Sequence, residues 1–165
     1  MSEQLDRGRF LARPGTLWLL FGATVLITLA FPPVAGNWGL TLLDGVASPE
    51  QVRELIAGMT PEQRTAHAWI TGTLDVAYPL AYASFFAGAA LRFFPKAGGV
   101  LAIFALLAIP VDLFEGLVQI LALTGRADWV ATKSFITPLK MVLFLGGMAF
   151  TLLGLARWAY RRVVA

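Results

Sequence analysis

Two carboxylates, Asp112 and Glu115, lie inside an almost uninterrupted apolar run that extends from residue 97 to residue 123. A third acid, Asp75, and a lysine, Lys140, interrupt two other apolar runs. A charged side chain at the centre of a membrane-spanning helix costs about 2.5–3.5 kcal/mol on insertion scales, so such residues rarely face lipid. We therefore expect the three acids to point into the protein, where ionisable side chains commonly mark a functional site.

Helical spacing places these residues on polar stripes, because residues three, four and seven apart share one face of a helix. The stripes are His67, Thr71, Asp75, Tyr78 and Tyr82 in the second apolar run, Asp112, Glu115 and Gln119 in the third, and Lys133, Thr137 and Lys140 in the fourth. Counting about 1.5 Å per residue from the flanking tryptophans puts the charged positions at one depth, in the outer half of the membrane. The pattern predicts a shared interior pocket that is lined by Asp75, Tyr78, Tyr82, Asp112, Glu115, Gln119 and Lys140.

The predicted pocket holds three acids and one lysine, so two carboxyl groups are in excess. Carboxyl groups that face one another in a water-poor site titrate as a coupled set, and we expect them to share one or more protons near neutral pH. Two interpretations of Lys140 are open. It pairs with the acids, or it snorkels to the outer interface from a helix that starts with Thr137 as its N-cap and Pro138 as its first residue.

An acidic pocket with aromatic walls suits a cation, which is attracted by the carboxylates and by the ring faces of Tyr78, Tyr82 and Phe114. The first functional hypothesis is therefore binding or translocation of a proton or a small or amphiphilic cation. Four helices are few for a complete alternating-access carrier, so the transport version of this hypothesis requires a homo-oligomer.

The second hypothesis is an intramembrane acid/base enzyme, of the isomerase kind, that acts on a lipid-like substrate. Asp112 or Glu115 would be the general acid, Asp75 the base, and Tyr78 an orienting group. In topology the arrangement resembles the EXPERA-domain group of sterol isomerases and sigma-2-type receptors, which have four or five spans, a helical segment after the first, and acids in the next helices. No diagnostic motif of that group occurs, so the resemblance assigns no residue roles.

The third hypothesis is structural. In a subunit whose buried charges only clamp the bundle, Asp75 would bond to Tyr78 or Thr71, and Glu115 would pair with Lys140. Interhelical polar bonds of this kind often contribute modestly to assembly.

We expect no metal and no other cofactor. His67, Asp75, Asp112 and Glu115 could offer oxygen and nitrogen ligands, but no HExxH or ExxH spacing occurs, and a lone interfacial histidine is usually solvated. The chain has no cysteine, and no serine lies in a GxSxG motif.

Composition identifies the elements that must position these side chains. The 165 residues are 58% hydrophobic and only 14% charged, whereas soluble domains are about 45–50% apolar. The excess gathers in runs long enough to cross a bilayer as helices, at about 17–34, 68–94, 97–123 and 138–157. The first run also has signal-peptide features with a poor cleavage site at residues 34–36, and we expect it to be retained.

Basic residues and tryptophans predict the orientation in the membrane. Basic residues collect beside one set of span ends, at Arg7, Arg9, Arg13, Arg92, Lys96, Arg157, Arg161 and Arg162, and the opposite side has fewer, at Arg53, Arg64, Arg126 and Lys133. The positive-inside rule then puts both termini in the cytoplasm, and we expect a bacterial inner membrane. The basic residues form no nucleic-acid-binding motif, so we expect the lipid bilayer rather than nucleic acid as partner.

Two helix starts occur between the first and second runs, at residues 48–51 (SPEQ) and 60–63 (TPEQ). Each has a hydroxyl N-cap, a proline, an acid and a glutamine in capping-box order. The first predicts a short amphipathic interfacial helix at about 49–58, and the second predicts that the second span begins near Pro61. The expected fold is a single all-α domain, 1–165, an antiparallel up-down bundle of four transmembrane helices with small-residue contacts through Ala77, Ala81, Gly88, Gly146, Gly147 and Gly154.

Overall fold

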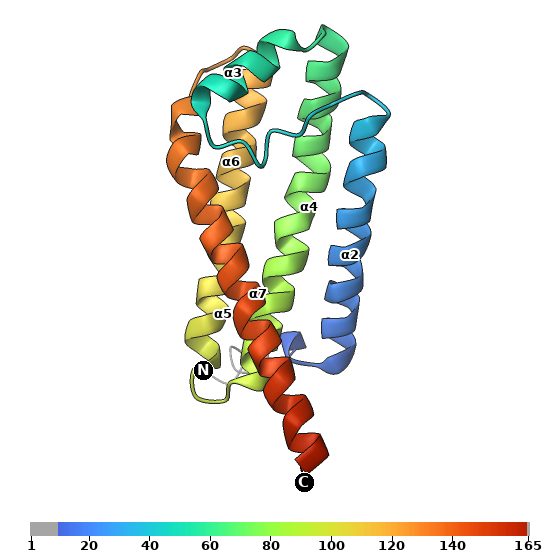
Figure 1. Ribbon diagram of the computed structural model, residues 1–165, viewed down its shortest axis with the longest axis vertical. Coiled ribbons are helices and arrows are strands. Elements are labelled where there is room, and N and C mark those ends of the chain that lie inside the picture. The colour runs from blue at the N-terminus through green and yellow to red at the C-terminus, as the bar shows by residue number, and fades with distance from the viewer. Residues whose placement is uncertain (1–9, 165) are drawn as a thin grey trace.

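The computed structural model describes residues 10–164, and within that range the chain is helical with no strand. Arg7 and Arg9, two of the residues used to predict orientation, lie outside the described range. The elements are α2 (Pro14–Gly36), α3 (Pro49–Gly58), α4 (Pro61–Phe93), α5 (Gly98–Leu106), α6 (Ala108–Leu123), the 3₁₀ helix η1 (Val130–Thr132) and α7 (Lys133–Val164) (Figure 1).

Four helical segments are long and apolar enough to span a membrane: Pro14–Gly36, Pro61–Phe93, Gly98–Leu123 and Val130–Val164. With the short α3 between the first and second spans, they confirm the predicted all-α fold. Figure 1 shows α3 at one end of the bundle, and the start of α2 with the end of α7 at the other. We call these the α3 end and the terminal end.

Helix α4 is the centre of the bundle and packs against α2, α5, α6 and α7. More than half of its most apolar stretch, 56%, is buried, whereas only 6% of the corresponding stretch of α2 is buried. Helix α2 contacts mainly α4 and turns most of its surface outward. An evenly hydrophobic helix in that position is suited to lipid contact on most of its circumference.

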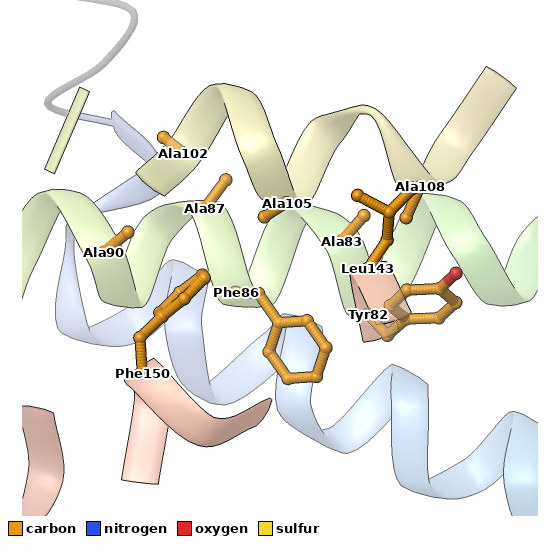
Figure 2. Packing of buried hydrophobic residues seen from close by; sticks show 10 residues of the cluster. All are labelled: Tyr82, Ala83, Phe86, Ala87, Ala90, Ala102, Ala105, Ala108, Leu143 and Phe150. Carbon is orange, nitrogen blue, oxygen red and sulfur yellow. The ribbon is translucent and has the colours of Figure 1, made fainter. Parts of the chain in front are cut away.

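The core toward the terminal end is built from alanine against aromatic rings (Figure 2). Small side chains bring α4 close to α5 and α6, since they let two backbones approach; these are Ala83, Ala87 and Ala90 on α4 and Ala102, Ala105 and Ala108 opposite. Glycines of α7 leave room for phenylalanine rings of neighbouring helices. Gly146 lies against Phe104, Gly147 against Phe86 and Gly154 against Phe93. Gly88 lies against Leu11 and Leu17. Of the two alanines expected at contacts, Ala81 is buried and Ala77 is only partly buried.

The third span is interrupted at Leu107, between α5 and α6. Pro110 lies three residues further along and has no amide hydrogen to give to the carbonyl of Leu106, which explains an interruption at this point. The proline in the second span acts differently, because α4 runs through Pro79 without a break.

Helix α7 begins at Lys133, and not at Pro138 as the helix-start signal suggested. The turn η1 leads directly into it, and Pro138 lies inside the helix. Thr137 is therefore not an N-cap. Its hydroxyl donates to the Glu115 carboxylate of α6, and this contact between helices takes the place of the expected cap.

The α3 end is closed by α3 and by the chain that leads into it. Val52 and Ile56 of α3 pack with Leu43, Leu123 and Val130, so α3 caps the bundle with its apolar face. The predicted start of α4 is confirmed, because Thr60 and Gln63 form a reciprocal capping box. At the start of α3, the Ser48 hydroxyl accepts from the Gln51 amide.

Candidate functional site

The polar stripes of α4, α6 and α7 face one another in the half of the bundle nearer α3. The structure brings together all the charged residues expected there. It adds Asp44 and Lys133, which were not in the predicted set. The buried side chains of that set are Asp75, Tyr82, Asp112, Glu115, Gln119 and Lys140, and Tyr78 is partly buried. We call Asp44, Asp75, Asp112, Glu115, Lys133 and Lys140 the charged cluster.

Lys140 is buried and joins three carboxylates. Its Nζ lies 3.1 Å from Asp44 Oδ1, 3.1 Å from Asp112 Oδ1 and 2.5 Å from Glu115 Oε2. The alternative in which Lys140 snorkels to the interface is therefore wrong. The contacts with Asp44 and Asp112 are hydrogen bonds, and the contact with Glu115 Oε2 is an ion pair.

Glu115 has no exposed surface, and each of its two oxygens lies beside a lysine. Its Oε1 accepts from Lys133 Nζ at 2.5 Å and from the Thr137 hydroxyl, while Lys140 lies at Oε2. Lys133 is itself completely buried. Sequence reasoning placed Lys133 on the α7 stripe but assigned it to the outer loop, because the helix was expected to start after it.

Sequence analysis did not predict Asp44 as a member of the site. It comes from the chain between α2 and α3, where Leu43 is buried and its amide donates to His67 Nε2 at 3.3 Å. Asp44 Oδ1 accepts from Gln119 Nε2 at 3.1 Å as well as from Lys140. Burial alone would raise the pKa of Asp44, but the charge and hydrogen bond of Lys140 hold the pKa below its ordinary value. A sequence signal did exist, since Asp44 is the only ionisable residue between Arg13 and Glu50.

His67 is buried rather than solvated, which corrects the expectation from its isolated position. Because Nε2 accepts from the Leu43 amide, the proton belongs on Nδ1, which lies 3.3 Å from the Thr71 hydroxyl. The neutral ring thus anchors the segment that delivers Asp44, and it is not a ligand facing the acids.

Tyrosine side chains line the cluster on the side of α4. The Tyr82 hydroxyl donates to Asp112 Oδ2 at 2.8 Å. The ring of Tyr78 makes edge contacts with Tyr82 and with Phe31 of α2, at centroid distances of 5.0 and 5.8 Å. Phe114, which was expected to add to this lining, is 41% exposed and does not line the cavity, because its position on α6 turns it outward.

A cavity of about 350 Å³ adjoins the cluster, and we call it the lateral cavity. It lies between α2, α4, α6, α7 and the segment that carries Asp44. Its accessible walls are mostly apolar, and the polar side chains among its lining residues are Thr28, Asp44, Asp75, Tyr78, Tyr82, Asp112 and Lys140. Asp75 is 7% exposed, and its Oδ2 atom has no hydrogen-bond partner.

Three carboxylates, from Asp44, Asp112 and Glu115, place oxygen atoms within 4.8 Å of one another, a spacing that could hold a metal ion. The same three groups surround Lys140 Nζ, which takes the position that a cation would need. The ammonium group supplies the positive charge that such a set of oxygens requires.

The charged cluster contains four acids and two lysines, which is a formal excess of two acids. The sequence predicted the same excess from a smaller set of three acids and one lysine. The lysines contact Asp44, Asp112 and Glu115. Asp75 is the acid that neither lysine contacts among the described ion pairs.

Comparison with known proteins adds no further assignment, because no family model, curated protein or solved structure matches the chain. It is a membrane-spanning helical protein with buried acidic residues. The functional argument therefore rests on the geometry of the charged cluster and of the lateral cavity.

Proposed function

We propose that the lateral cavity binds the positively charged head of an amphiphile, with Asp75 as the principal anchor. The observation that supports this most strongly is the Asp75 carboxylate, which lies in the cavity wall with one buried oxygen and no partner for it. A buried polar atom without a hydrogen bond is costly, so a ligand donor at this position would gain more than at an exposed carboxylate.

The charge of the cluster favours a cation over an anion. Lys140 and Lys133 are engaged by three of the four acids, and the remaining acid faces the cavity. A bound ammonium group near Asp75 would lower the formal excess of acids from two to one, in a site where charges are weakly screened. The rings of Phe31 and Tyr78 add a surface that attracts cations.

Access to the cavity from the bilayer favours an amphiphile over a free ion. The cavity is bordered by side chains of α2 and α7 that are exposed on the outer surface of the bundle, namely Thr28, Pro32 and Met141. Helix α2 packs mainly on α4 and not tightly on α7. A ligand can therefore enter sideways and leave an apolar tail among the lipid chains.

The core favours binding over translocation. From Ala83 to Ala90, the buried face of α4 is packed with alanine and phenylalanine against α5 and α7. Between this packing and the terminal end, Thr151 is the one buried polar side chain among the described residues. Its hydroxyl donates a hydrogen bond to the Gly147 carbonyl. A proton or ion in the cavity has no continuous polar path through this part of one chain.

The structural hypothesis and the binding hypothesis apply to different parts of the cluster. Glu115, Lys133 and Thr137 hold α6 and α7 together through mutual contacts, as a clamp would.

The catalytic hypothesis has less support, because the proposed general acids already contact donors through both oxygens. Asp112 contacts Lys140 and Tyr82. Glu115 contacts Lys133, Thr137 and Lys140. Carboxylates held in this way are acceptors rather than general acids.

Binding of dodecylamine to the protein in phosphatidylcholine nanodiscs tests the proposal, with displacement of radiolabelled dodecylamine as the readout. We expect saturable binding by the wild type, loss of at least about tenfold in affinity in Asp75→Asn, and no change in Asp128→Asn, an acid at the α3 end that pairs with Arg53. Dodecanol, which has the same tail without the charge, should compete poorly.

The proposal fails if wild type binds no dodecylamine saturably, if Asp75→Asn binds it equally well, or if dodecanol competes as strongly. The fold of the variant is checked by its thermal unfolding. Asparagine has nearly the size of aspartate and keeps a polar group at this position, so Asp75→Asn should unfold close to the wild-type temperature. Reduced binding by a well-folded Asp75→Asn protein would then be a direct effect on the site.

A further inference from the structure

The terminal end of the bundle carries a concentration of positive charge. Its described charged side chains on the helix ends and connecting turns are all basic: Arg13, Arg92, Lys96, Arg157, Arg161 and Arg162. Four of them, Arg92, Lys96, Arg157 and Arg161, line one cavity of about 480 Å³ between the α4–α5 turn and α7. We call this the basic cavity.

An apolar cavity adjoins the basic cavity. A second cavity of about 380 Å³ lies between α2, α4 and α7 and is lined mainly by Leu17, Trp18, Phe21, Phe85 and Leu155. The two cavities share Arg92, Phe93 and Trp158 in their walls, so they lie next to each other. Arg92 is held at the junction by a bond from its guanidinium to the Ala12 carbonyl, at 3.0 Å.

We infer that these two neighbouring cavities together form a binding site for an anionic phospholipid. The phosphate lies among Arg92, Lys96, Arg157 and Arg161, and one acyl chain lies in the apolar cavity between α2 and α7. Basic pockets between membrane helices bind acidic head groups through this combination of charge and apolar surface. Guanidinium groups suit phosphate oxygens because of their paired donors.

The depth of the site agrees with this ligand. Trp18 and Trp158 lie in the walls of the apolar cavity, and tryptophan prefers the level of the lipid head groups. An anionic lipid is favoured over a zwitterionic one because a choline group would add positive charge to four basic side chains. A free phosphate ion would leave the apolar cavity unused. This inference does not depend on the proposed ligand of the lateral cavity.

Quenching of tryptophan fluorescence by phosphatidylglycerol with brominated acyl chains tests the inference, in phosphatidylcholine nanodiscs at physiological salt. We expect saturable quenching in wild type and about 30-fold weaker affinity in the double variant Arg157→Gln/Arg161→Gln. The matched control is Arg13→Gln/Arg162→Gln, which removes the same charge from the same end but changes no residue of the basic cavity. It should lose much less affinity.

Three results would overturn the inference. Equal losses in the two double variants would show a diffuse attraction of the surface for anionic lipid. Equal quenching by brominated phosphatidylcholine would show that the charge of the head group does not determine binding. Full competition by glycerol 3-phosphate would show a site for the free phosphate anion. Native mass spectrometry of the released protein should show bound phosphatidylglycerol in wild type and less of it in Arg157→Gln/Arg161→Gln.

Discussion

Glu115 and Lys133 face each other without any exposed surface, at 2.5 Å between Oε1 and Nζ. A buried ion pair contributes little net stability over an apolar pair, because the desolvation of both charges offsets their attraction. The loss of one partner is different, since it leaves the other charge uncompensated. Glu115 keeps Lys140 after such a loss, so the cost should lie at the low end of the range for broken buried pairs.

Lys133→Met should therefore lower the free energy of unfolding by about 3 kcal/mol. The measurement is a denaturant titration with sodium dodecyl sulfate in mixed micelles, followed by tryptophan fluorescence. Lys96→Met, at an exposed lysine in the α4–α5 turn, is the control and should change the stability little. Addition of Glu115→Gln to Lys133→Met should recover part of the loss; strictly additive effects of the two substitutions would contradict a coupled pair.

Helical phase accounts for the site residues that sequence could predict. Asp75, Asp112 and Lys140 each lie within a regular helix, where spacing of three, four and seven residues determines which side chains share a face. Asp44 lies in a segment without such a period, and its position depends on a tertiary contact, the bond from the Leu43 amide to His67. No local pattern in the sequence predicts that contact.

At the scale of elements, the contact between α4 and α7 depends on glycine. Gly147 lies directly under the Phe86 ring, and an added methyl group would overlap that ring. Phe86 has little room to move, because it packs against Tyr82, Phe144 and Phe150. A small residue at this position is what lets the two helices approach closely.

Gly147→Ala should cost about 1–3 kcal/mol through overpacking. Gly99→Ala, in the first turn of α5, has nothing within 4 Å of the added methyl group and should leave stability unchanged or raise it slightly. Unfolding midpoints of the two variants in the same detergent give the comparison. A Gly147→Ala protein as stable as Gly99→Ala would show that α4 and α7 can separate at no cost.

Capping signals in the sequence predicted the starts of α3 and α4 correctly and the start of α7 incorrectly. Thr60 with Gln63 fixes the start of α4 by local hydrogen bonds that the sequence displays. Thr137 with Pro138 displays a similar signal, but the Thr137 hydroxyl is taken by Glu115 of another helix. Tertiary contact overrode local preference, and α7 gained the turn that carries Lys133.

At the scale of the whole molecule, four spans bring the end of α7 to the same end of the bundle as the start of α2 (Figure 1). The burial of Lys133 removes one positive charge from the exposed surface of the α3 end, and Arg53 there is paired with Asp128. The excess of exposed basic residues at the terminal end is therefore larger than a count of the sequence suggests. By the positive-inside rule, the terminal end should face the cytoplasm.

The absence of cysteine makes this orientation directly testable, because a single introduced thiol reports its own side. Asn37→Cys, just after α2, should react with a membrane-impermeant maleimide in intact cells. Ala97→Cys, in the turn before α5, should react only after permeabilisation. Both positions are exposed, so a difference in labelling reports the side and not the burial. The opposite pattern would show that the bundle is inverted.

The alanine and phenylalanine packing around Ala83, Ala87 and Phe86 has an electrical consequence. Among the described residues, the buried ionisable side chains lie in the half of the bundle nearer α3, and the buried core of the other half is apolar apart from Thr151. A charge held near Asp75 stays on its own side of that insulating layer. We therefore expect the protein to reside in an energised membrane without discharging the voltage across it.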